Sequence, residues 1–434
     1  MLLDFKLNKM RLSFSNIFKH AMLATATVAM ASCSMMKEDL DDCPTGLYVR
    51  FIYDYNTQRA DMFKDHVGHV EVLVFDEGKQ LVASRTVSNT KESAPLSQYG
   101  YSVHFTPDEV PGGHNYRIQV IGMQKDFAEA QSTPGAKYRY AGDHRAHAEA
   151  LSVTLDHNST PIDGTDHHAV SDIAPLDTLW HTLKVISTLP TDGKVIAPLA
   201  STIKPFAIYG EDGLKETGGE YNVRVEDGKA TYATVSLIRD TKHLGIGIHQ
   251  VDPNYKKSMS GDQFEVRIVD SNPTVAHDNE VISERKVRYT PYAAWTMMMD
   301  ADGNTGIETI HKGNLSQTGA NTTKAEEADP DNVVERVPYY NIMFNRMMLN
   351  SSDNSENGTL EIIDKESGKT IARVNLPHYL SLGRDAYALE NYSHQEYLDR
   401  EYNYNLDFFL SGGEWIAMEI RVLSWSKRIQ FENL

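Results

Sequence analysis

Cysteine is scarce in this chain of 434 residues, which contains only Cys33 and Cys43. Two cysteines are too few for a zinc cluster built on cysteine and allow at most one disulfide. Basic residues are also in the minority, because 42 lysines and arginines face 60 aspartates and glutamates and leave a formal net charge of -18. This balance argues against nucleic acid as a partner, since phosphate binding needs clustered positive side chains.

Long apolar runs are missing as well. The clearest run covers residues 21–31, after the basic residues Lys9, Arg11 and Lys19. As a helix it spans about 16 Å, roughly half of a ~30 Å hydrocarbon core, so it is too short for a stable transmembrane anchor. A basic start, a short apolar stretch and a small-residue cleavage site are typical of a secretory signal. We therefore predict that residues 1–32 are a signal peptide, cleaved between Ser32 and Cys33.

The sequence Ala31-Ser32-Cys33 resembles the bacterial lipobox, with Met30 where leucine is usual. The resemblance implies that acyl chains such as palmitate are attached to the sulfur and the new amino group of Cys33. Two or more chains anchor a protein stably, whereas a single chain holds it only marginally. A plain secretory signal followed by a chance cysteine is the alternative. If Cys33 carries lipid, Cys43 has no partner in its own chain and no disulfide forms.

A charged segment follows the lipidation site. It resembles the short tag that sends lipoproteins of some anaerobes to the outer leaflet of the outer membrane. Polar segments of this kind stay solvated and flexible, so residues 33–44 are predicted to be a lipidated tether facing the cell surface. A tether facing the periplasm is the alternative. The residues of the predicted export tag are Lys37, Glu38, Asp39, Asp41 and Asp42.

Strand signals dominate the rest of the chain. Leu47, Val49, Phe51 and Tyr53 alternate with more polar residues, which is the pattern of a half-buried strand. Many such short strands with few helices predict a mainly β protein with two β-sandwich domains, at residues 45–238 and 239–434. We expect a long loop with at most one helix at residues 124–170 and a short helix at residues 377–382.

Several segments carry a family resemblance when taken together. They are residues 43–56, 60–63, 70–76, 235–242, 289–292, 395–404 and 415–425, and they include Val235-Ser-Leu-Ile-Arg-Asp-Thr-Lys242 and Tyr397-Leu-Asp-Arg400. These segments resemble the anchor subunits of the fimbriae (type V pili) made by Gram-negative anaerobes. The resemblance implies two transthyretin-like β-sandwich domains and a structural role without enzymatic activity. It also implies that the protein attaches the base of a fimbrium to the outer membrane and ends its growth, with pilin subunits as partners.

Pilins of this kind assemble when one subunit adds a strand to a groove in its neighbour, which satisfies open backbone groups and fills side-chain pockets. Stalk subunits are typically freed by proteolysis after an arginine near the first strand, where this chain has Arg50 and Arg59. We hypothesise that an uncut first strand keeps the groove filled and stops further addition. The last strand either closes its own fold or is donated, through Trp415, Ile416, Met418, Ile420 and Val422.

Other chemistry finds weak support in the sequence. No zinc-protease, nucleophile-elbow or phosphate-loop motif occurs, and we predict neither a cofactor nor a metal. The histidines at 144, 147, 157, 167, 168 and 181 match no standard metal-ligand spacing, and Asp300-Ala-Asp-Gly-Asn304 lacks the glutamate of a calcium loop, so we expect a tight turn there. The 22 tyrosines and four tryptophans leave a second hypothesis open, a surface glycan-binding lipoprotein for nutrient capture.

Overall fold

A computed structural model describes residues 44–125, 138–156, 167–169, 175–188, 190–191, 194–195, 208–209, 215–216, 223–256, 258–283, 285–312, 329–350, 357–385, 389, 391–412, 414–422 and 425–430. The predicted signal peptide, the lipidation residue Cys33 and the charged tag from Lys37 to Asp42 lie outside these residues. Among the described helices, none is long and apolar enough to cross a membrane.

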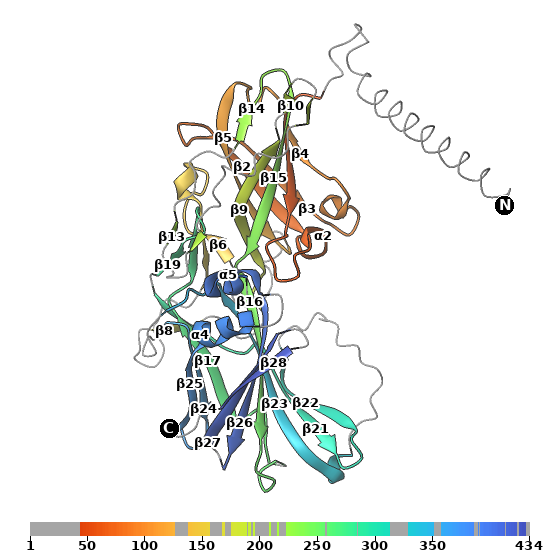
Figure 1. Ribbon diagram of the computed structural model, residues 1–434, viewed down its shortest axis with the longest axis vertical. Coiled ribbons are helices and arrows are strands. Elements are labelled where there is room, and N and C mark those ends of the chain that lie inside the picture. The colour runs from red at the N-terminus through yellow and green to blue at the C-terminus, as the bar shows by residue number, and fades with distance from the viewer. Residues whose placement is uncertain are drawn as a thin grey trace, which may run out of the picture.

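One curved sheet forms the upper half of the molecule (Figure 1). Its strands, in spatial order, are β3 (Leu81–Ser88), β2 (His69–Phe75), β5 (His114–Met123), β9 (Leu179–Thr188), β15 (Ala230–Arg239), β1 (Gly46–Ile52) and β4 (Val103–Phe105), while β14 (Val223–Val225) pairs with β5. The edge strands β3 and β4 lie close together. Arg85 of β3 donates hydrogen bonds to the backbone oxygen of His104 in β4 and to Glu109. The sheet therefore wraps around one apolar core, which includes Val49, Val72 and Val120.

Two further sheets, with seven and five strands, build the lower half. The first has the order β22 (Thr305–Lys312), β21 (Ala293–Asp300), β23 (Val333–Asn345), β16 (Thr241–Gln250), β26 (Asn403–Ser411), β27 (Glu414–Val422) and β28 (Trp425–Gln430). The second has the order β25 (Thr370–Asn375), β24 (Thr359–Asp364), β17 (Phe264–Asp270), β20 (Lys286–Tyr289) and β8 (His167–Ala169). A second core joins them, with Ile246, Ile268, Ile362 and Phe408 among its members.

The expected long loop at residues 124–170 is wrong in part. It contains β6 (Tyr138–Tyr140) and β7 (Ser152–Leu155), which join β18 (Thr274–Ala276) and β19 (Val281–Ile282) in a four-stranded sheet, and also β8. Strands of three or four residues are too short to show a period in the sequence. Two further ladders have strands of two residues, β10 (Pro190–Thr191) with β11 (Lys194–Val195), and β12 (Ile208–Tyr209) with β13 (Lys215–Glu216).

Helices are few and short among the described residues. They are α2 (Phe63–His66), α4 (Leu376–Ser381) and α5 (His394–Arg400), with single 3-10 turns at η2 (Pro95–Ser97), η3 (Ala148–Ala150), η4 (Pro330–Asn332) and η5 (Leu382–Asp385). The helix expected at residues 377–382 corresponds to α4. Helix α5 lies at the level where the two halves meet (Figure 1).

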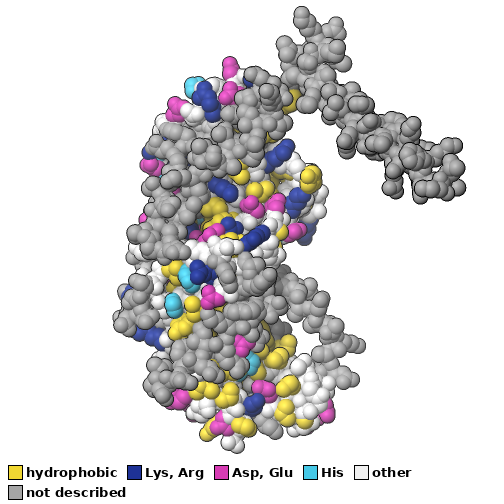
Figure 2. Space-filling model, in the orientation of Figure 1, with side chains coloured by type: hydrophobic (Ala, Val, Ile, Leu, Met, Phe, Trp, Pro, Cys, Tyr) yellow, Lys and Arg dark blue, Asp and Glu magenta, His cyan; other side chains and the backbone are white. Residues whose placement is uncertain are grey.

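The mainly β architecture is confirmed, and it consists of several sheets. The division of the chain into domains at 238 and 239 stays a prediction. The chain passes from β15 to β16 at Asp240, yet β7 and β8 precede that point and pair with strands that follow it, β18 and β20. Positive and negative side chains are interspersed on the face seen in Figure 2.

Glu71 of β2 connects the segment at residues 138–156 to the upper sheet. Its carboxylate accepts hydrogen bonds from Arg145, His144 and the hydroxyl of Tyr140. Burial alone raises the pKa of Glu71, but the hydrogen bonds from His144, Tyr140 and Arg145 outweigh burial and lower the pKa to about 2. The ionised form of Glu71 therefore stabilises the folded state.

This arrangement predicts a pH dependence. The stabilisation by Glu71 is complete above its unfolded-state pKa near 4.5 and is lost as the pH falls towards 2. The gap in unfolding free energy between the natural protein and Glu71→Gln should therefore shrink by about 2 kcal/mol between pH 5.5 and pH 2.5. Urea unfolding at a series of pH values measures this gap. A gap that is constant with pH contradicts the assigned role of the ionised carboxylate.

Candidate functional site: the first strand and the junction between the halves

The first strand is an internal member of the upper sheet. On one side β1 runs parallel to β15, with seven residue pairs from Gly46 with Ala230 to Ile52 with Ser236. On the other side it runs antiparallel to β4, with three pairs. The strand nearest the predicted lipidation site therefore occupies the gap that would otherwise separate β15 from β4.

The side chains of β1 alternate between core and surface, as the sequence predicts. Leu47 and Val49 are 0% exposed and Phe51 is 7% exposed. On the other face, the ring of Tyr48 stacks between His104 of β4 and Tyr232 of β15. Removing β1 would thus expose an apolar groove as well as the backbone edges of two strands.

Arg50 and Arg59, the two arginines near the first strand, both make contacts. Arg50 lies on the surface face of β1, with its guanidinium carbon 5.3 Å from the ring centre of Tyr232. Arg59 lies in the loop after β1, where its Nε donates a 2.7 Å hydrogen bond to the hydroxyl of Tyr392 in the lower half. Both residues are exposed.

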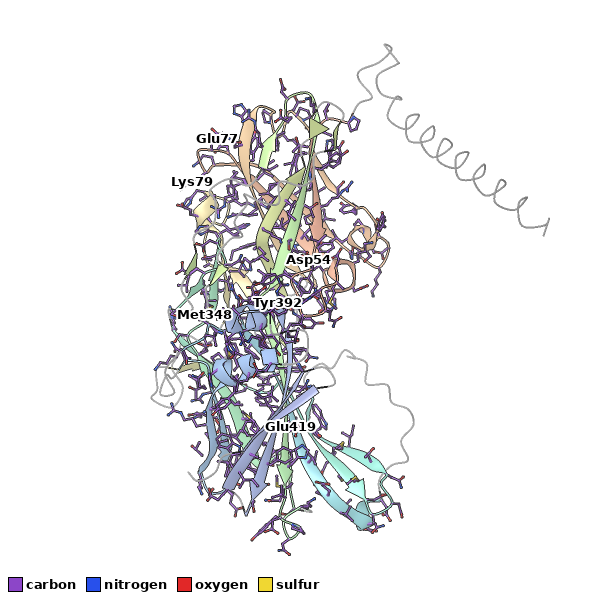
Figure 3. The ribbon with its side chains drawn as sticks, in the orientation of Figure 1. Asp54, Glu77, Lys79, Met348, Tyr392 and Glu419 are labelled. Carbon is purple, nitrogen blue, oxygen red and sulfur yellow. The ribbon has the colours of Figure 1, made fainter. Side chains whose placement is uncertain are left out.

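The loop after β1 joins the two halves. Asp54 accepts a 2.7 Å hydrogen bond from Ser236 of β15. Thr57 donates a 2.9 Å hydrogen bond to Glu401, which directly follows α5. The guanidinium of Arg400 lies 4.0 Å from the ring centre of Tyr55. Figure 3 shows Asp54 a little above Tyr392, with both residues near the middle of the molecule, where the two halves meet.

Helix α5 is the centre of the junction on the lower side. Its sequence start, Ser393-His-Gln-Glu396, has the spacing of a capping box, and the hydroxyl of Ser393 accepts from the backbone N–H of Glu396. At its other end, Lys242 of β16 donates to the backbone oxygens of Asp399 and Glu401 at 2.7 and 2.8 Å. A lysine satisfies the last carbonyls of a helix and complements its dipole.

Buried charges hold this helix in place. Arg346, at 0% exposure, makes two parallel hydrogen bonds of 2.7 and 2.8 Å to the carboxylate of Asp399. Burial lowers the pKa of Lys242 to about 7, although the nearby carboxylate of Asp399 opposes that change. Loss of one partner from such a cluster leaves an uncompensated charge in the interior, which is strongly destabilising.

The upper side of the junction has its own cluster, at the end of β15. The guanidinium carbon of Arg239 lies 4.3 Å from the ring centre of Tyr402 and 5.4 Å from that of Trp180. His181 and Asp240, both buried, are 2.5 Å apart between Nδ1 and Oδ2. The sequence blocks 235–242 and 395–404, which carry the family resemblance, thus meet here, together with the loop after β1.

The C-terminal residues predicted as a donor or closing strand lie in β27, between β26 and β28. Met418 and Ile420 are buried in the lower core, Trp415 packs against it, and Ile416 is 37% exposed. Val422 pairs with Trp425 at the start of β28, which is the edge strand of its sheet.

No group of three or more metal-ligating side chains that could hold a metal ion occurs among the described residues. His144 stacks on Tyr140 and His181 pairs with Asp240, while His157 lies outside the described residues. The Asp300 motif forms the expected turn between β21 and β22. Its carboxylate accepts N–H donors from Asp302, Asn304 and Asp329.

Comparison with known proteins identifies the family of this chain. Residues 40–200 and 215–431 match the family model of the fimbrillin-A associated anchor proteins Mfa1 and Mfa2. The chain belongs to this family. No curated protein sequence matches it.

Solved structures are similar over most of their length. A candidate adhesin from Bacteroides thetaiotaomicron is 22% identical, with 90% of this chain and 100% of that chain covered and a TM-score of 0.57. A candidate polysaccharide-binding protein from the same species is 20% identical, with the same coverage and a TM-score of 0.55. The fimbrial anchor protein Mfa2 from Porphyromonas gingivalis is 13% identical, with 88% and 99% covered and a TM-score of 0.45.

Membership of this anchor family makes the chain a fimbria-associated surface protein, and the family is structural rather than enzymatic. The junction agrees with a structural role. Its charged side chains contact one another and backbone carbonyls, and they pack between two cores.

The junction generates a stability prediction. Thr57→Val keeps the shape of the side chain but removes the donor to the buried carboxylate of Glu401. The free energy of unfolding should fall by about 2 kcal/mol, because hydrogen bonds to charged groups contribute more than neutral ones. Equilibrium unfolding in urea measures the change. Thr86→Val, at an exposed position of β3, is the matched control and should stay within about 0.5 kcal/mol. Equal losses of unfolding free energy in the two variants would contradict a stabilising hydrogen bond between Thr57 and Glu401.

Proposed function

We propose that this protein is the anchor that attaches the base of a fimbrium to the outer membrane. The observation that carries the proposal is the position of β1 inside its own sheet, paired on both sides. A subunit at the base needs a connection to the membrane at one end and a connection to the adjoining pilin at the other. It also needs a structural feature that prevents the addition of a further subunit, so that growth of the fimbrium stops.

The groove between β15 and β4, which β1 fills, is that feature. A subunit whose first strand has been removed offers two open strand edges and an empty apolar groove to the next subunit. In this chain β1 already satisfies β15 and β4 and fills the pockets with Leu47, Val49 and Phe51. No strand from a further subunit can enter while β1 is in place, so the fimbrium ends at this protein and its length is limited.

The adjoining pilin is reached through strand addition from the C-terminal end. Strand β27 is bonded to neighbours on both sides, whereas β28 pairs with β27 alone among the strands that the structure describes. Releasing β28 breaks one ladder, and releasing β27 breaks two. This difference favours Trp425–Gln430 as the part of the C-terminal segment that leaves its sheet to pair with a neighbour.

Attachment to the membrane rests on Cys33. Lipidation at Cys33 and the tag from Lys37 to Asp42 would hold the protein at the outer leaflet, with the fimbrium outside the cell. The short distance in sequence between Cys33 and β1 supports this arrangement, because the lipid then lies next to the strand that stays in place.

The lipid attachment is tested with the two cysteines. Cys33→Ser should move the protein from the membrane fraction to the medium and cause fimbriae to be shed, because no acyl chain then holds it. Immunoblots of the two fractions and electron microscopy of the cells measure both effects. Cys43→Ser is the matched control and should leave the protein and the fimbriae on the cell. Fimbriae that stay attached in the Cys33→Ser strain would refute the proposal.

A second candidate function is that of a surface lipoprotein that binds glycans for nutrient capture. The observation in its favour is an aromatic pair on the neighbouring strands β21 and β23 of the seven-stranded sheet. The rings of Trp295 and Tyr339 stack there with their centres 5.7 Å apart. Flat aromatic faces bind sugar rings, and one similar structure is described as a candidate polysaccharide-binding protein.

Deletion of the gene separates the two candidates. The anchor proposal expects shed or abnormally long fimbriae and unchanged binding of polysaccharide to the cells. Fimbriae of normal length and attachment, together with lost polysaccharide binding, would favour the glycan binder. Electron microscopy and binding of labelled polysaccharide to whole cells measure the two outcomes in the same strains.

A further inference from the structure

We propose that β1 is the strand through which the protein resists tension, because a pull on the lipid loads β1 in shear against β15. This inference rests on the proposed function, in which the lipid lies before β1 and the fimbrium is held by the lower half. It adds a mechanical function to attachment and assigns that function to one strand pair.

The direction of the strands is the first reason. Strands β1 and β15 are parallel and in register from Gly46 with Ala230 to Ile52 with Ser236. Their first residues lie at the end remote from the lower half, beside the turn between β14 and β15, where the N–H of Gly46 donates to the oxygen of Lys229. Strand β15 then runs down towards β16 and the lower half (Figure 1).

Tension between the lipid and the lower half therefore pulls β1 along its own axis, past β15. All seven residue pairs resist such a pull together, because none is closer to the force than the others. A pull across the strands at one end opens the same pairs one after another, and each opening needs much less force. The same ladder thus has a strong and a weak direction, and the lipid lies at the end that loads the strong one.

The far end of β1 is the second reason. The loop that follows is fixed to the lower half by Thr57 with Glu401 and by Arg59 with Tyr392. Tension can pass from β1 directly into the lower half at this point. The buried row Leu47, Val49 and Phe51 adds resistance, because sliding the strand drags these side chains through a packed core.

Force spectroscopy on single molecules tests the inference with purified protein. The full mature chain carries Cys33→Ser, so that the natural Cys43 just before β1 is the first attachment point. Ser411→Cys supplies the second point at the remote end of β26, and Lys229→Cys supplies it beside the start of β1. Both residues are exposed, and the two proteins differ only in the direction of the pull.

The first rupture should need a several-fold higher force between residues 43 and 411 than between residues 43 and 229. Equal forces, or a lower force in the first direction, would overturn the inference. The measurement uses neither lipid nor fimbriae, so it is independent of the Cys33→Ser test in cells. Equal rupture forces would refute the mechanical inference but not the proposal that lipid attaches the protein to the membrane. Fimbriae that stay attached in the Cys33→Ser strain would refute lipid attachment but would not change the measured rupture forces.

Discussion

The pairing of β1 with β15 is the interaction on which the rest of the upper half depends. Without β1, the wall formed by β15 and β4 loses seven residue pairs on one side and three on the other, and the core loses Leu47, Val49 and Phe51. In the proposed function, β1 also lies next to the lipid and fills the groove by which a further subunit would enter.

The junction at α5 turns two β halves into one body. Isolated apolar contacts between domains allow sliding, whereas directed hydrogen bonds between buried charges fix one arrangement. Lys242 and Arg346 hold the end of α5 from the lower side, and Thr57 reaches Glu401 from the upper side. In the proposed role at the base of a fimbrium, this joint would pass force from the upper half to the lower half through the hydrogen bonds at α5.

The mainly β class, β1 and the helix at Pro377 follow from local patterns, because alternation and short-range capping depend on neighbouring residues alone. Strand β9 shows a less regular pattern, because Trp180 and Ile186 put apolar residues where simple alternation with Leu179, Leu183 and Val185 would put polar ones. Helix α5 was missed although Ser393 and Glu396 have capping-box spacing. The junction could not be predicted, because Thr57 and Glu401 are 344 residues apart and no local pattern encodes their contact.

The central claim is that β1 stays covalently attached and in its own groove in the assembled fimbrium. N-terminal sequencing and intact-mass measurement of this protein, isolated from purified fimbriae, test it most directly. The account predicts a chain that begins at lipid-bearing Cys33 and still contains Gly46–Ile52. A new terminus at residue 51, after Arg50, or at residue 60, after Arg59, would contradict it, because the groove would then have been opened by proteolysis.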